Sequence, residues 1–193
     1  NNTNGDHGDL KVIGNSTPRY EYSFRLGADY KGFDLSIYCQ GIGKRKIWGA
    51  GQLAIPGWNA KEGAMPETFC KDYWTEDNTD AYYPRAWDLG GSNTGFTMQR
   101  QSKYLLNMAY LRVKNINFGY TFPQKWMKKA YINNLRVYMS LENFFTFDHL
   151  RGLPIDPEAI SGYSMFSDNY NLGRTGTGTP VFKSLSFGLQ LSF

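Results

Sequence analysis

Several features that would place this chain in a common class are absent from its 193 residues. No run of about 18 consecutive apolar residues occurs, which excludes a transmembrane helix, and no amino-terminal stretch resembles a signal peptide. The cysteines number only 2, Cys39 and Cys70, without CxxC or HxxxH spacing. A disulfide scaffold and a zinc site are therefore excluded. We expect Cys39 to pack as a small hydrophobic residue, and a disulfide between the two cysteines is the less favoured alternative.

An excess of one charge and the usual catalytic groups are also missing. The 21 Lys and Arg exceed the 17 Asp and Glu by only four and are scattered, so no nucleic-acid surface is predicted. The one basic cluster, Lys44-Arg45-Lys46, is interpreted as a solvated strand end rather than a phosphate site. The two histidines, His7 and His149, lie in no triad or nucleophile-elbow context. The sequence thus predicts no enzyme and no cofactor.

One acidic cluster is a candidate metal site. Glu76, Asp77, Asn78 and Asp80 offer the grouped oxygen atoms that Ca²⁺ prefers. The sharp-turn glycine and the distal bidentate glutamate of an EF-hand are missing, so solvated loop acids are the favoured interpretation and no metal is predicted.

Aromatic residues are abundant, at 17% of the chain, with 14 Tyr, 13 Phe and 5 Trp. Near the carboxy terminus, bulky apolar residues alternate with small or polar ones from about residue 181 to 193. A period of two places the two sets on opposite faces of a β-strand. The pattern is typical of a transmembrane β-barrel strand, but a half-buried strand of a soluble sandwich shows it too. This segment alone leaves both open.

Four further strands are predicted, over about 18–30, 33–41, 104–122 and 134–146, from the same alternation. Lys31-Gly32 predicts a tight hairpin turn between the first two. In the third strand the apolar phase slips, which predicts a β-bulge near Lys114-Asn115. Pro123 and the residues after it predict one helical turn.

The connections between these strands alternate in length. Two are short, while the connections over about 42–100 and 148–179 are long. Outer-membrane barrels have short periplasmic turns and long extracellular loops, and a soluble domain seldom needs such long connections. The sequence therefore favours an all-β membrane barrel. Five strands cannot close, and open edges in lipid would leave backbone groups unpaired, so we expect the last five antiparallel strands of a larger barrel.

Many motifs occur in the order found at the carboxy-terminal end of one family. They are Gly8-Asp9-Leu10-Lys11-Val12-Ile13-Gly14-Asn15, Tyr30-Lys31-Gly32-Phe33-Asp34-Leu35, Tyr110-Leu111-Arg112-Val113-Lys114-Asn115, Gly119-Tyr120-Thr121-Phe122-Pro123, Leu135-Arg136-Val137-Tyr138, Glu142-Asn143-Phe144-Phe145-Thr146, Asp156-Pro157-Glu158 and Leu185-Ser186-Phe187-Gly188-Leu189-Gln190-Leu191-Ser192-Phe193. Over nearly its whole length, the chain resembles SusC/RagA-type TonB-dependent outer-membrane transporters.

This resemblance implies a barrel of about 22 strands with an amino-terminal plug and a TonB box, neither of which is present in this chain. It implies active import of oligosaccharides or oligopeptides across the outer membrane of a Bacteroidota-type bacterium. The implied partners are the rest of the barrel and its plug, a SusD-like surface lipoprotein, the TonB-ExbB-ExbD complex and outer-membrane lipid. The ending also resembles the barrel assembly signal, with Phe187, Leu189, Leu191 and Phe193.

Two groups of residues are candidates for binding roles. Aromatic residues of the first long loop are candidates for contact with substrate or with a lid protein. Packing in a compact loop core, or contact with the lid, is favoured over direct contact with substrate. The residues are Trp48, Trp58, Trp74, Tyr82, Tyr83 and Trp87. Charged residues on the polar strand faces are expected to line the lumen as charge ladders or plug contacts, rather than as a substrate site; they are Arg19, Glu21, Arg25, Asp29, Arg136 and Glu142.

Two other functions stay open at this point. A secreted soluble all-β glycan-binding or glycan-cleaving domain would use the same aromatic residues and would fold without detergent. A passive porin would lack a plug and would not depend on TonB.

Overall fold

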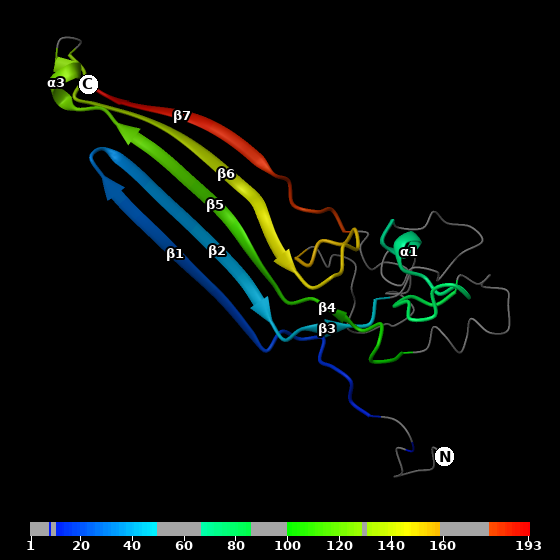
Figure 1. The fold of residues 1–193 in the computed structure, drawn as a ribbon. Helices are drawn as coiled ribbons and strands as arrows, with labels where there is room; N and C mark the ends of the chain where they lie inside the picture. The colour runs from blue at the N-terminus through cyan, green and yellow to red at the C-terminus, as the bar shows by residue number, and fades with distance from the viewer. Residues whose placement is uncertain (1–7, 9–10, 50–66, 86–99, 129–130, 159–177) are drawn as a thin grey trace. The chain divides into compact units, whose positions relative to one another are not determined.

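The structure is a computed structural model that describes residues 8, 11–49, 67–85, 100–128, 131–158 and 178–193 (Figure 1). The chain divides into two compact units. The sheet unit comprises Arg19–Gly43, Ala109–Asp148 and Pro180–Phe193, and the loop unit comprises Asn1–Pro18, Lys44–Met108 and His149–Thr179. Among the described residues there is no helix with the length and apolar character needed to cross a membrane.

The sheet unit is a 5-stranded antiparallel sheet in the order β1-β2-β5-β6-β7. Its strands are β1 (Tyr20–Tyr30), β2 (Phe33–Gly43), β5 (Tyr110–Thr121), β6 (Asn134–Asp148) and β7 (Ser184–Ser192). Each strand lies beside its neighbour in the chain within this sheet, so the sheet is an up-and-down meander (Figure 1). The predicted all-β antiparallel architecture is confirmed.

The two short connections of the sheet have the predicted conformations. Lys31 and Gly32 have φ angles of 48° and 90°, as a tight hairpin with two left-handed residues requires. Between β5 and β6, the short helix α3 (Gln124–Met127) forms the predicted helical turn. Pro123 lies at its N-cap position rather than at the first helical position.

The predicted bulge is present at Lys114. Tyr38 of β2 pairs with Asn115 and Cys39 pairs with Val113, so β5 carries one extra residue between these pairs. On the other side of β5, Val113 pairs with Phe145 while Asn115 pairs with Glu142. Between these pairs β6 therefore has two residues, Asn143 and Phe144, where β5 has only Lys114.

The strand expected over 104–122 is divided, which corrects that expectation. Residues Leu106–Asn107 form β4, which pairs with β3 (Lys46–Ile47) in a separate 2-stranded sheet, and β5 starts only at Tyr110. The physical reason is burial: Tyr104, Leu106 and Met108 alternate into the core of the loop unit. Strand β2 ends later than expected, at Gly43, and β6 ends later, at Asp148, while β7 is shorter than predicted.

The loop unit has a hydrophobic core of its own. Its helix α1 (Glu67–Lys71) contributes Phe69. The buried cluster gathers side chains from distant parts of the sequence: Ile47, Phe69, Tyr83, Tyr104, Leu106, Met108, Leu150, Leu153 and Ile155. Part of the first long connection is thus a small packed core rather than an extended loop.

The two faces of the sheet differ sharply. The register places most bulky apolar residues of the five strands on one face and most polar residues on the other, with Ile42 and its partner Tyr110 as exceptions on the polar face. On the apolar face, Phe187 and Leu189 of β7 are 74% and 61% exposed, and Leu26 of β1 is 59% exposed. Nothing within the described residues covers this face. A soluble sandwich would bury it against a second layer.

Candidate functional site

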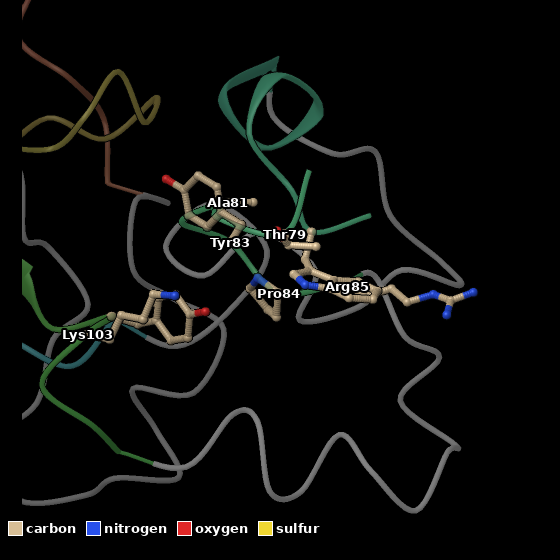
Figure 2. Close-up of a pocket in the computed structure, with 8 residues that line it drawn as sticks. Thr79, Ala81, Tyr83, Pro84, Arg85 and Lys103 are labelled. Carbon is tan, nitrogen blue, oxygen red and sulfur yellow. The ribbon is translucent and has the colours of Figure 1, made fainter. Parts of the chain in front are cut away.

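The loop unit holds an open pocket of about 490 Å³ (Figure 2). Two of the predicted contact residues, Trp74 and Tyr83, line it together with the end of the segment that leads into β4. The lining residues are Trp74, Thr79, Ala81, Tyr83, Pro84, Arg85, Lys103 and Tyr104. Figure 2 shows the Arg85 side chain extending away from Tyr83 and Lys103.

Local hydrogen bonds hold the segment that carries the pocket. The Trp74 amide donates to the Tyr83 carbonyl oxygen at 3.0 Å, and the Tyr83 amide donates to the Asp72 carbonyl oxygen at 3.2 Å. The Thr75 and Asn78 backbones bond to each other in both directions. A tight turn therefore returns the chain so that Trp74 and Tyr83 lie on neighbouring segments.

Two tyrosines, Tyr82 and Tyr104, and two cations form one wall of the loop unit. The rings of Tyr82 and Tyr104 meet edge to face with centroids 5.6 Å apart. The Lys103 Nζ lies 5.6 Å from the Tyr82 ring centroid and 5.5 Å from that of Tyr104. The Arg151 guanidinium lies 3.9 Å from the Tyr82 centroid, within cation–π range, and also 3.7 Å from a carboxylate oxygen of Asp72.

The hydroxyls of Tyr82 and Tyr104 donate to backbone carbonyl groups. Tyr82 donates to the Lys103 carbonyl oxygen at 2.5 Å, and Tyr104 donates to the Tyr82 carbonyl oxygen at 3.1 Å. Burial raises the pKa of Tyr104 to about 12, and it also raises the pKa of Tyr83. Both phenols are neutral at physiological pH. The pocket can stack a planar or ring-shaped group and accept a negative one near Lys103.

The other predicted aromatic residues lie elsewhere or outside the described residues. Trp48 and Tyr82 are partly buried and pack against the loop-unit core. Trp58 and Trp87 lie outside the described residues. The structure therefore brings Trp74 and Tyr83 together at one pocket and uses Trp48 as packing.

The six predicted wall residues all belong to the sheet unit. The register places Glu21, Arg25 and Asp29 of β1 on the same face as Arg136 and Glu142 of β6. Arg19 precedes β1, and its amide donates to the Gly43 carbonyl oxygen at 3.3 Å. The alternation predicted this shared polar face.

An ion pair on this face was missed by the sequence reasoning. Asp34 of β2 accepts two hydrogen bonds from Arg136 of β6, from Nε at 2.9 Å and from Nη2 at 2.5 Å. The pair spans β5 above Gly119, where any side chain would overlap it. Asp34 alternates in phase with Ser36, Tyr38 and Gln40, and this phase was the only signal that could have placed it on the polar face.

Other polar residues line the same face in hydrogen-bonded pairs. Asn115 Nδ2 donates to the Ser140 hydroxyl at 3.0 Å, and Asn117 Nδ2 donates to Asn115 Oδ1 at 2.5 Å. Arg112, which is only 3% exposed, donates from Nε to the Thr146 hydroxyl at 2.8 Å. The face is thus a continuous polar wall between β2 and β6.

The two cysteines do not form a disulfide. Cys39 is buried and Cys70 is exposed, and both are free thiols. The acids Glu76, Asp77 and Asp80 are exposed, and the described ranges contain no group of three or more metal-ligating side chains.

The basic cluster Lys44-Arg45-Lys46 is only partly exposed. Lys44 and Lys46 are exposed, while Arg45 donates from Nε to the Ser16 carbonyl oxygen at 2.9 Å. His149 is exposed at the end of β6, and His7 lies outside the described residues.

Comparison with known proteins defines the class of this chain. No protein-family model matches it. It is 27% identical over 186 residues to TonB-dependent receptor P3 of Formosa agariphila, which covers 96% of this chain and 17% of that relative. The chain is therefore homologous, over nearly its whole length, to part of a TonB-dependent receptor.

The solved structures agree with this class. The sheet aligns with part of the RagA barrel in the structure of the RagAB peptide transporter, with a TM-score of 0.64, 26% identity, and coverage of 94% of this chain and 18% of that one. The RagAB peptide importer in its closed-closed state gives a TM-score of 0.65 at 24% identity, covering 98% of this chain and 19% of that one, which supports the fold. The SusC/RagA-type resemblance drawn from the sequence is confirmed. The chain spans less than a fifth of the length of these relatives.

Proposed function

We propose that this chain forms the last five strands and two extracellular loops of a TonB-dependent outer-membrane importer. One observation carries the proposal: a sheet with one exposed apolar face and one polar face, in a chain homologous to RagA. The apolar face would contact lipid, and the polar face would line the lumen. Strand lengths of 9 to 15 residues suit a tilted crossing of the membrane.

The loop unit would then lie on the extracellular side, because it contains both long connections. There its aromatic pocket would meet substrate or a SusD-like lipoprotein that closes the barrel mouth. A structural relative is described as a peptide transporter, so we propose oligopeptides as the first substrate class to test and oligosaccharides as the second. Energy would come from TonB-ExbB-ExbD through a plug.

The work of this region is binding and gating rather than bond-making. The polar wall with Arg25, Glu21 and the Asp34–Arg136 pair would face the plug or the passing substrate. Charge ladders of this kind stabilise the wall and would give the lumen its polarity without a catalytic group.

Uptake by the natural host tests the proposal. We expect cells to accumulate fluorescent oligopeptides or oligosaccharides, and expect the uptake to be lost when either this gene or tonB is deleted. The protein should also float with outer-membrane vesicles and require detergent for extraction. Uptake that survives the tonB deletion would indicate a passive porin, and recovery in the soluble fraction would contradict a membrane role.

A further inference from the structure

A continuous series of aromatic rings extends from the apolar face of the sheet to α3. Phe33 of β2 lies 5.8 Å from Phe118 and 4.5 Å from Tyr120, measured between ring centroids. Tyr120 lies 5.0 Å from Phe122, and Phe122 lies 6.4 Å from Trp126 of α3. These five rings, here called the ring chain, connect the apolar wall to the connection between β5 and β6.

The ring chain ends beside a group of lysines. Trp126 is 63% exposed, and Lys125 and Lys128 flank it in sequence. The β1–β2 turn lies at the same end of the sheet as α3 (Figure 1), and its Lys31 Nζ lies 5.2 Å from the Tyr30 ring centroid. All three lysines are exposed.

The acidic side chains near this end of the sheet are turned to the other face. Asp34 lies on the polar face, where it is engaged by Arg136, and Asp29 is paired with it in register. This end of the sheet therefore combines exposed rings with exposed lysines, and the acidic side chains of β1 and β2 near it lie on the polar face.

We propose that the α3 end of the sheet binds the headgroup of an anionic phospholipid, with Trp126 at the interface and Lys125 and Lys128 on the phosphate. The proposal rests on the membrane location proposed above. Aromatic rings concentrate where hydrocarbon meets water, and lysines near a membrane surface favour anionic lipids. Lipid is favoured over a protein occupant because the ring chain is continuous with the exposed apolar face of the strands, so one medium would cover both.

Quenching by brominated lipids tests this site in the protein purified from its host membrane. The protein is reconstituted into phosphatidylcholine vesicles containing one-fifth phosphatidylglycerol, with bromine placed on one or the other lipid. The fluorescence of Trp126 is obtained as the difference between the wild-type protein and Trp126→Phe. We expect the brominated phosphatidylglycerol to quench this difference signal well beyond its share of the lipid.

Charge variants then separate the headgroup from the apolar contact. In Lys125→Gln/Lys128→Gln, we expect the preference for phosphatidylglycerol to fall by about fivefold for each lysine removed, while quenching by phosphatidylcholine persists. The control Lys11→Gln/Lys71→Gln removes the same charge from the loop unit and should leave the preference unchanged. Added salt should weaken the wild-type preference.

The outcomes distinguish this site from the proposed function. Equal quenching by the two lipids, or a preference untouched by the lysine substitutions, would overturn the headgroup site. A Trp126 signal that no lipid quenches, in a protein that floats with the vesicles, would place Trp126 away from the bilayer and would also overturn the headgroup site. Failure of the protein to float at all would contradict the membrane location itself.

Discussion

At the scale of single residues, the Asp34–Arg136 pair organises the polar face by linking β2 to β6 across β5. Its geometry is bidentate, and both side chains are 26% exposed. Charge-assisted, paired hydrogen bonds of this kind are stronger than simple surface ion pairs. We expect Asp34→Asn and Arg136→Gln each to destabilise the protein, with a coupling free energy of about 1 kcal/mol between them.

Denaturant unfolding of the protein in detergent measures this coupling through a double-mutant cycle. A cycle between Glu21→Gln and Arg136→Gln is the matched control, because no ion pair joins these residues in the described part of the chain, and it should give no coupling. Additive effects of Asp34→Asn and Arg136→Gln would show that the pair contributes nothing as a unit.

Gly188 is a second residue on which the polar face depends. A Cβ at Gly188 would overlap the Tyr138 ring, which lies across the strand from it, whereas a Cβ at Gly27 would meet only the Leu35 carbonyl oxygen at 3.7 Å. We expect Gly188→Ala to destabilise the protein by roughly 1 to 3 kcal/mol, and Gly27→Ala to be close to neutral. Melting temperatures of the two variants make the comparison, and equal shifts would refute the close approach of Tyr138.

The buried phenol of Tyr104 makes the stability of the loop-unit core depend on pH in the alkaline range. Burial raises its pKa to about 12, above the value of 10.0 for an exposed tyrosine. The folded loop unit therefore holds this proton more tightly than the unfolded chain does. Its contribution to stability is fully present below pH 10 and is lost as the pH rises toward 12.

The tyrosinate absorbance of the loop unit can follow this titration. We expect Tyr104→Phe to remove a late-titrating tyrosine and to reduce the loss of stability between pH 10 and pH 12. Tyr131→Phe is the control, because Tyr131 is 90% exposed. The prediction fails if both variants change the alkaline curve in the same way.

At the scale of elements, alternation predicted all five strands of the sheet, and one phase slip predicted the bulge at Lys114. A second irregularity in β6 was invisible. Relative to β2, β5 carries one extra residue and β6 carries two. Because β6 has an even number of extra residues, its apolar side chains stay at odd positions on both sides of the irregularity, as Leu141 and Phe145 show. Only Asn143, with a φ of 56°, marks the place, and no apolar pattern reports a φ angle.

The difference between the faces of β7 gives a prediction at this scale. Leu189 lies on the apolar face and is 61% exposed, whereas Ser186 lies on the polar face opposite Ser140. In a membrane wall, we expect Leu189→Arg to cost roughly 2 to 4 kcal/mol near the midplane, and Ser186→Arg to be mild. Ser186 is a better control than Gln190, which pairs with Arg136 and would bring two guanidinium groups together.

Assembly in outer membranes measures this difference, through the fraction of heat-modifiable, folded protein in each variant. A defect confined to Leu189→Arg supports lipid contact on the apolar face. Equal defects in the two variants would contradict that assignment of the faces.

At the scale of the whole molecule, the sequence predicted the sheet far better than the loop unit. A strand can be predicted from a short stretch of sequence, because its apolar side chains recur with a period of two. The loop-unit core instead joins Ile47, Phe69, Tyr83, Tyr104 and Leu150, which are far apart in the chain and share no period. The sequence therefore predicted only a loop for the first long connection. The structure is needed to show that Trp48 packs against the core and that Trp74 lines the pocket.

The edges of the sheet decide whether it is a wall of a larger barrel. Among the described residues, β1 pairs only with β2, and β7 pairs only with β6. Each of these strands therefore presents a row of backbone N–H and C=O groups without a partner strand, and such groups cost several kcal/mol each in hydrocarbon. In a closed barrel, every one of them pairs with a neighbouring strand.

Hydrogen exchange in the assembled membrane protein tests this closure. Strand β5 has partner strands on both sides. We expect the edge amides of Tyr20–Tyr30 that point away from β2, and those of Ser184–Ser192 that point away from β6, to exchange as slowly as the amides of β5. The amides of the exposed turn residues Glu76 and Asp77 provide the fast reference. Fast exchange along either edge, with β5 protected, would mean that β1 or β7 has no further partner strand. The closed barrel would then be contradicted.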